Sequence, residues 1–122
     1  MTSLVLLSHG SRRAVSNEEM MALAEAVEGR EDNPFDPVRC AFQQFAEPTF
    51  ETVVEALVQE NVERIVVFPL FLSSGSHVLE DVPELVKGIK RRFPQLEITV
   101  TAHLGGTKNF ADYLLKSVLE QS

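Results

Sequence analysis

The chain has 122 residues, the length of one domain, and 44% of them are hydrophobic, as in an ordinary globular protein. Its formal net charge of −7 at pH 7 argues against generic binding to nucleic acid or to an anionic membrane, because phosphate contacts need clustered Lys and Arg. The longest apolar stretch, residues 65–72, is too short to span a bilayer, and the first residues lack the basic start of a signal peptide. A lone cysteine, Cys40, fits a reducing compartment, so we expect a cytoplasmic protein.

Four strand–helix units follow one another along the sequence. Each begins with a short apolar run typical of a buried strand, and apolar residues at helical spacing come after it. The strands are expected at residues 4–8, 38–45, 64–69 and 97–101. No linker or internal repeat interrupts this order, so residues 1–122 are expected to form a single domain.

Polar residues suited to helix starts precede each helical segment. The expected first residues or caps are Ser16, Thr49, Asp81 and Thr107. Ser16 and Glu19 have the S-x-x-E spacing of a capping box. The third helix is expected only after a long loop, residues 70–80, and the last is expected to turn Phe110, Leu114 and Val118 inward.

Alternating strands and helices predict an α/β domain of three layers around a four-stranded parallel sheet. In such a sheet, the loops that follow the strands gather at one edge, where the positive ends of the helices also point. The chain has three histidines, and this pattern places His9, His77 and His103 at that edge, together with Glu47.

Each of these residues has a functional and a purely structural interpretation. His9 follows the first strand, beside Gly10, whose missing side chain leaves access to the ring; alternatively, its ring only closes the turn. Glu47 is held at the end of the second strand by Pro48, or it merely favours the dipole of the next helix.

The other two histidines also allow two interpretations. His77 comes on a loop of small residues, as binding loops often do, or is an ordinary surface histidine. His103, before a glycine turn, has the weakest functional case. Taken together, two imidazoles and one carboxylate from three strand ends indicate metal handling coupled to proton transfer, with Co²⁺, Fe²⁺, Ni²⁺ or Zn²⁺ as suitable ions.

Several short motifs, in order along nearly the whole chain, resemble those of one family. They are SHGSR at residues 8–12, FAEP at 45–48, PLFL at 69–72 with G-x-H at 75–77, and DVP at 81–83. This combination resembles the short form of the sirohydrochlorin cobaltochelatases, class II tetrapyrrole chelatases related to the sirohydrochlorin ferrochelatases. The resemblance implies a chelatase-like fold, lyase activity and a homodimer with its sites between subunits.

The same resemblance implies a reaction and its residues. A divalent metal, with Co²⁺ favoured and Fe²⁺ or Ni²⁺ as the other candidates, is inserted without ATP into sirohydrochlorin or a related early tetrapyrrole of cobalamin or sirohaem-type biosynthesis. By position, His9 and His77 match the metal-binding histidines and Glu47 the acidic residue. The chain departs from the family pattern at His103, which is a third candidate metal ligand. No cofactor is expected beyond the metal substrate.

Substrate-binding residues are expected in the loops that carry the two histidines. A macrocycle fringed with carboxylates suits Arg12 and Arg13, which lie next to His9 in the sequence. We also expect contacts from Ser11, Ser74 and Gly75.

Two other functions remain open at this stage. A hydrolase related to the histidine phosphatases is suggested faintly by the sequence around His9, although Ser8 stands where an arginine is required. A non-enzymatic metal-binding or metallochaperone module would use the same three histidines. It would bind metal without binding a tetrapyrrole.

Overall fold

The computed structural model describes residues 1–73 and 77–122, and only the backbone of residues 77–79. Its elements, in chain order, are β1 (Thr2–Ser8), α1 (Ala14–Glu28), β2 (Val38–Phe42), α2 (Phe50–Gln59), β3 (Arg64–Pro69), α3 (His77–Arg92), β4 (Glu97–Val100), the short 3-10 turn η1 (Leu104–Gly106) and α4 (Phe110–Gln121). None of the helices described is long and apolar enough to cross a membrane.

The four strands form one parallel sheet in the order β2-β1-β3-β4, which confirms the predicted α/β class. β1 is paired on both sides: Leu6 is the partner of Cys40 on β2 and of Phe68 on β3. Because side chains alternate along a strand, β1 contributes to both faces of the sheet. Val5 and Leu7 belong to one apolar core, and Leu6 belongs to the other.

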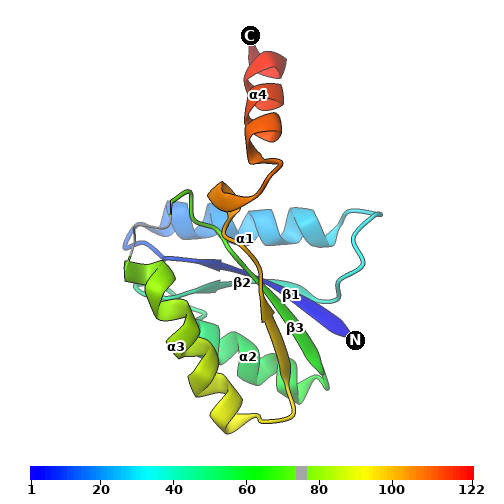
Figure 1. The fold of residues 1–122 in the computed structure, drawn as a ribbon, viewed down its shortest axis with the longest axis vertical. Coiled ribbons are helices and arrows are strands. Elements are labelled where there is room, and N and C mark those ends of the chain that lie inside the picture. Colours follow the sequence, from blue (N-terminus) through cyan, green and yellow to red (C-terminus); the bar gives the residue numbers. More distant parts are fainter. Residues whose placement is uncertain (74–76) are drawn as a thin grey trace.

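The two cores lie on opposite faces of the sheet and differ in size. The larger is formed with α2 and α3, which bring Phe50, Leu57 and Ile89 against the strands. The smaller is formed with α1 through the buried Ala24, and it includes Cys40. Figure 1 shows α1 on one side of the sheet and α2 and α3 on the other.

The start of α2 was predicted correctly, and the start of α1 was not. The Thr49 hydroxyl accepts a hydrogen bond from the backbone N–H of Thr52 and caps α2. α1 begins earlier than the expected capping box, with Arg13 at its N-cap and Ser16 inside the helix. The reason is Asn17, whose side-chain amide binds both the N–H and the carbonyl of Ser11 and so holds the first turn against the loop.

Two of the other boundaries differ because of local hydrogen bonds. β2 ends at Phe42, not at residue 45, and the Phe42 N–H donates to the Pro48 carbonyl, which closes the 43–48 loop at its base. β4 ends at Val100, and Thr107 does not start the last helix. Its hydroxyl instead donates to the Leu104 carbonyl within the η1 turn. α3 begins at His77, so Asp81 is inside that helix and not at its cap.

The last helix is the largest departure from expectation. α4 has no buried residue, and Leu114 and Val118, which were expected to face inward, are 51% and 54% exposed. Figure 1 shows α4 extending beyond the edge at which the strands end, away from the sheet. The apolar spacing predicted the helix correctly but its burial wrongly.

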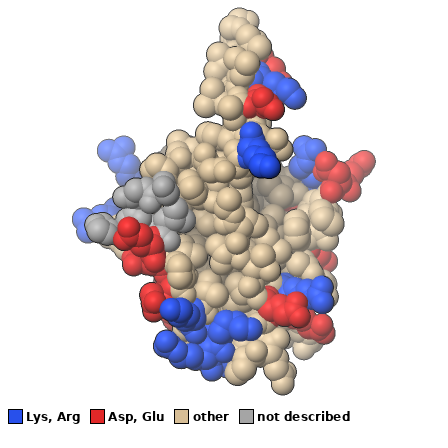
Figure 2. Space-filling view, viewed as in Figure 1, with Lys and Arg blue, Asp and Glu red and all other residues tan. Residues whose placement is uncertain are grey.

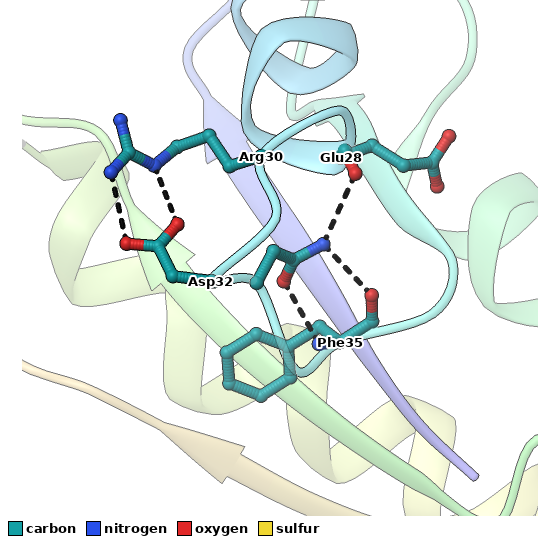
Figure 3. Close-up of polar contacts among 5 residues, drawn as sticks. Glu28, Arg30, Asp32 and Phe35 are labelled. Atoms are coloured by element: carbon teal, nitrogen blue, oxygen red, sulfur yellow. Dashed lines mark hydrogen bonds and ion pairs between the residues drawn. The ribbon is translucent and has the colours of Figure 1, made fainter.

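The connection from α1 to β2 is held by its own polar contacts (Figure 3). Arg30 makes two hydrogen bonds to the carboxylate of Asp32, at 2.8 and 2.9 Å. The side-chain amide of Asn33 donates to the Phe35 carbonyl and accepts a hydrogen bond from the Phe35 N–H, and it also donates to the Glu28 carbonyl. These bonds fix the direction in which the chain enters β2.

Candidate functional site

The loops after β1 and β2 are joined at the carboxyl edge of the sheet. The N–H of Gln43 donates to the Ser8 carbonyl at 3.0 Å, and that of Gln44 to the His9 carbonyl at 2.9 Å. Gly10 has φ +93°, and a Cβ there would lie 1.8 Å from the Gln44 carbonyl oxygen. Glycine is therefore required by this backbone crossing, a reason different from the access to His9 that the sequence suggested.

His9 is half-buried at the end of β1, and one of its ring nitrogens is already used. Nδ1 lies 3.0 Å from the Gly10 carbonyl oxygen. A carbonyl oxygen only accepts hydrogen bonds, so this contact places the proton of the neutral ring on Nδ1. The lone pair is then on Nε2, where it can bind a metal ion or accept a proton. The hydrogen bond that holds the His9 ring against the turn is therefore compatible with a functional role of Nε2.

Phe45 contacts both His9 and Arg12, and no role for it was expected from the sequence. Its ring centroid lies 5.8 Å from that of His9, and the guanidinium carbon of Arg12 lies 4.8 Å from the same ring. Phe45 has φ +65° and is 51% exposed. The place of Phe45 in the FAEP motif was the only signal in the sequence. Its left-handed backbone conformation is not visible in a sequence.

Ser11, in the loop after β1, fixes the position of Arg13. The Ser11 hydroxyl accepts a hydrogen bond from the Arg13 N–H at 3.0 Å, which positions Arg13 at the start of α1. Arg12 and Arg13 are both exposed. Two cations therefore stand at the carboxyl edge next to His9.

Glu47 is exposed at the same edge, at the start of α2. It precedes a cis peptide bond to Pro48, and its carboxylate accepts a hydrogen bond from the Thr49 N–H at 3.3 Å. This contact agrees with a carboxylate that favours the N-terminus of a helix. The same placement leaves the carboxylate in contact with water, to which it can pass protons.

His77 is the first residue of α3, after β3. Its backbone is therefore at the predicted edge, but its side chain lies outside what the structure describes. Ser74 and Gly75 also lie outside the described residues. The roles of all three stay predictions.

His103 lies at the start of η1 and is half-buried against a glycine. A Cβ on Gly106 would lie 2.8 Å from Cε1 of the His103 ring. The turn is attached to the loop after β3, because the Gly105 N–H donates to the Phe71 carbonyl at 3.0 Å. In the sheet order, β3 separates β4 from β1, so the strands that carry His103 and His9 are about 10 Å apart.

Acidic and basic groups occupy different parts of this edge. A pocket of about 340 Å³ opens beside the β2 loop, lined by Gln43, Gln44, Glu51, Asp81, Glu84, Leu85 and Gly88. Its three carboxylates contrast with Arg12 and Arg13 on the β1 loop. A larger pocket, about 590 Å³, lies at the opposite edge, where Arg64 and Glu97 begin β3 and β4. In Figure 2 the basic side chains gather most densely at the lower end of the molecule, far from α4.

Two further observations bear on metal and thiol chemistry. Among the residues whose side chains the structure describes, no three His, Cys, Asp or Glu residues gather closely enough to hold a metal ion. Cys40 is buried in the smaller core, and this burial raises the pKa of its thiol to about 11. Cys40 is therefore a small apolar residue of the core.

A four-stranded parallel domain with a histidine at the carboxyl end of one of its two inner strands has the architecture of the small chelatase-like α/β proteins. The chain belongs to the CbiX family, whose sequence model matches residues 3–121. This match confirms the family that the motifs suggested.

Individual relatives support the same family. The sirohydrochlorin cobaltochelatase of Methanocaldococcus jannaschii is 40% identical over 86 residues, which are 70% of this chain and 59% of the relative. The sirohydrochlorin ferrochelatase of Priestia megaterium is 28% identical over 98% of this chain and 44% of its own length. The chain thus spans about half the length of these relatives. A solved CbiX protein of cobalamin biosynthesis from Marinobacter aquaeolei VT8 is 27% identical with a TM-score of 0.80, and the match covers 100% of both chains.

Proposed function

We propose that this protein inserts a divalent metal, with Co²⁺ favoured, into sirohydrochlorin or a related early tetrapyrrole without ATP. The observation that carries the proposal is His9. In a chain of the CbiX family, it ends an inner strand of the sheet with Nδ1 bound to the Gly10 carbonyl and Nε2 available. Relatives in the same family are named as cobaltochelatases and ferrochelatases of sirohydrochlorin.

The reaction requires a metal donor and a proton acceptor. A metal-free tetrapyrrole releases two pyrrole protons as it takes up M²⁺, so charge balances without a nucleotide. Neutral imidazole can deliver the metal or accept a proton near pH 7. We assign these roles to His9 and His77, and proton release toward water to Glu47, whose exposed carboxylate stands at the same edge.

The charges at the edge favour one placement of the macrocycle. Its acetate and propionate groups are anionic, so they are attracted to Arg12 and Arg13 and repelled by the pocket that Glu51, Asp81 and Glu84 line. Phe45, more than half exposed beside His9, offers an apolar surface to the ring. These features favour a placement in which the centre of the macrocycle lies near Nε2 of His9.

The proposal includes a homodimer with its sites between subunits. The Priestia megaterium relative is more than twice as long as the part of it that this chain matches, so two copies supply a comparable length. One carboxyl edge, formed by four strands, is a shallow surface for a macrocycle, and a second edge facing it makes a cleft.

An anaerobic insertion assay tests this function. Sirohydrochlorin is mixed with the protein and with Co²⁺, Fe²⁺ or Ni²⁺ in turn, and the visible spectrum follows the metallated product. We expect insertion above the uncatalysed rate, fastest with Co²⁺. Metal binding without any change in the tetrapyrrole spectrum would identify a metal-binding module instead and overturn the proposed activity.

A further inference from the structure

The two arginines of the loop after β1 are held in different ways. Arg12 lies over an aromatic ring, with its guanidinium carbon 4.8 Å from the centroid of Phe45. Arg13 is the N-cap of α1, and its backbone N–H donates to the Ser11 hydroxyl. Both arginine side chains are exposed, and none of the ion pairs among the described residues uses either of them. Within the described chain, a side-chain contact therefore directs Arg12, and a backbone contact directs Arg13.

The backbone on both sides of this stack is anchored. In the loop after β1, the side-chain amide of Asn17 donates to the Ser11 carbonyl at 2.7 Å and accepts from the Ser11 N–H at 2.9 Å. In the loop after β2, the Gln44 N–H donates to the His9 carbonyl at 2.9 Å. The next residue, Phe45, has φ +65°, a costly conformation that persists where the surrounding structure holds it. The ring and the loop that carries the arginine are thus fixed relative to each other.

A second stacked arginine in the same chain shows what such a cation binds. Arg92 lies over Phe93, with its guanidinium carbon 5.2 Å from the ring centroid, and a terminal nitrogen lies 2.6 Å from the Glu55 carboxylate. A guanidinium carries its N–H donors around its edge, so a cation that lies over a ring keeps donors for a carboxylate. Arg12 has the same kind of ring contact but no carboxylate partner among the described residues, and residues 74–79 contain no Asp or Glu. A carboxylate that completes the arrangement at Arg12 therefore comes from another molecule.

We propose that Phe45 is a positioning residue, which holds the Arg12 guanidinium in place to bind one carboxylate of the tetrapyrrole beside His9. This inference rests on the proposed function and divides the roles of the two arginines, because Arg13 contributes only its charge. Phe45 contacts both the guanidinium and the imidazole, whose ring centroid is 5.8 Å from its own. The carboxylates lie on the rim of the macrocycle and the metal-binding nitrogens at its centre. One contact at the rim and one at the centre therefore fix its rotation over the site.

A cation that is held in advance binds a carboxylate more tightly. An exposed arginine has many rotamers, and the loss of this freedom opposes association. The ring restricts Arg12 before the ligand arrives and adds a cation–π attraction. Together these effects correspond to about threefold to tenfold in affinity. They act on the bound substrate and on the transition state alike, so they change Kd and KM and leave kcat unaltered.

A double-mutant cycle between Phe45 and Arg12 tests the inference. Phe45→Leu keeps an apolar side chain that tolerates the left-handed backbone no better, and Arg12→Gln removes the charge. The visible spectrum of sirohydrochlorin gives its Kd without metal, and metal insertion gives kcat. We expect Phe45→Leu to raise Kd about threefold to tenfold in the wild-type background, with kcat within about twofold. On the Arg12→Gln background, the same change should raise Kd by a factor at least about threefold smaller.

Each partner of the cycle has a matched control in the chain. On the Arg13→Gln background, Phe45→Leu should raise Kd by the same factor as in the wild type. Phe93→Leu removes the same kind of contact at the opposite edge of the sheet and should leave Kd unchanged. Phe45→Tyr keeps the face of the ring and should bind sirohydrochlorin nearly as tightly as the wild type. Circular dichroism checks that each variant is folded.

Two results overturn the inference and leave the proposed function standing. The first is an equal effect of Phe45→Leu on the wild-type and Arg12→Gln backgrounds, because the ring would then act on the macrocycle alone. The second is a Phe45→Leu variant with an unchanged Kd and a reduced kcat. In both cases, the wild-type insertion rate still reports the activity independently. A wild type that neither binds sirohydrochlorin nor inserts metal overturns the proposed function and this inference together.

Discussion

At the scale of single residues, the histidines of the carboxyl edge are not equivalent. His9 ends an inner strand and keeps Nε2 available, whereas His103 packs against Gly106 on a turn beyond β3. We expect His9→Ala to lower kcat/KM for metal insertion by at least ~100-fold, as loss of an acid–base or ligating group does. His77→Ala is expected to have the same effect, and His103→Ala to cost less than about tenfold or to change metal preference.

Steady-state kinetics of the three variants with Co²⁺, Fe²⁺ and Ni²⁺ checks this order. Circular dichroism controls for folding. An inactive His103→Ala variant beside a nearly wild-type His77→Ala variant contradicts the assigned site.

Gly10 allows a second prediction because another glycine serves as its control. A Cβ at position 10 meets the Gln44 carbonyl at 1.8 Å in a backbone with φ +93°, but at Gly29 the nearest atom is 3.5 Å away and φ is −76°. Gly10→Ala should destabilise the protein by at least about 2 kcal/mol, and Gly29→Ala should be neutral or slightly stabilising. Urea unfolding measures both. Equal stability of the two variants would show that the β1 and β2 loops adapt freely.

At the scale of elements, the caps of α1 and α2 make a matched pair. Thr49 accepts the Thr52 N–H, whereas Ser16 lies inside α1 and caps nothing. Thr49→Ala should therefore cost about 1 kcal/mol, and Ser16→Ala should change the free energy of unfolding by less than about 0.5 kcal/mol. If Ser16→Ala lowered the free energy of unfolding more than Thr49→Ala, the result would support the capping box that the sequence suggested.

The other end of α2 is sensitive to pH. Arg39 on β2 makes two hydrogen bonds to the carboxylate of Glu60 at the C-cap, and these bonds lower the pKa of Glu60. Because the folded-state pKa lies below the unfolded one, the stabilisation is present above the unfolded value and is lost as pH falls through the folded one. The contribution is small because both groups are partly exposed. Arg39→Ala should lose stability relative to the wild type at neutral pH, and the difference should shrink in acid, as urea unfolding at several pH values would show.

The sequence predicted strands better than helix starts, and the reasons are physical. Apolar runs identify buried strands directly, so residues 64–69 were located correctly and the first strand was missed only at its start. Ser16, Asp81 and Thr107 have suitable side chains for capping, but a cap also requires that the chain leave the helix there. The Asn17 bonds to Ser11 and the Thr107 bond to Leu104 decide otherwise, and neither pair is visible from residue type.

At the scale of the whole molecule, the sequence located the histidine edge but not the contacts within it. The order of strands and helices was sufficient to place His9, Glu47 and the start of α3 at one end of the sheet. The stacking of Arg12 on Phe45 depends on a left-handed backbone at Phe45, and the crossing at Gly10 depends on the exact path of another loop. Apolar spacing in α4 identified which side of the helix needs a partner and could not identify the partner.

The two cores predict how truncated chains behave. α4 buries no residue, so a chain that ends after residue 106 should keep both cores and unfold cooperatively. A chain that ends at residue 60 lacks β3 and β4, and β1 is left with one neighbour. We expect that shorter chain to be unfolded by circular dichroism and proton NMR. A folded 60-residue fragment would show that the smaller core is sufficient alone.

The inner position of β1 also has a consequence for the order of synthesis. β1 is the first strand of this chain to leave the ribosome, yet its partners are residues 38–42 on one side and 64–69 on the other. Until β3 has emerged, at least one edge of β1 has no strand to pair with. Val5 and Leu7 also have no complete core in which to pack. The nascent chain therefore carries an unpaired apolar strand edge until residue 69 has emerged. During this period, a chaperone that binds short apolar stretches would have its target in β1.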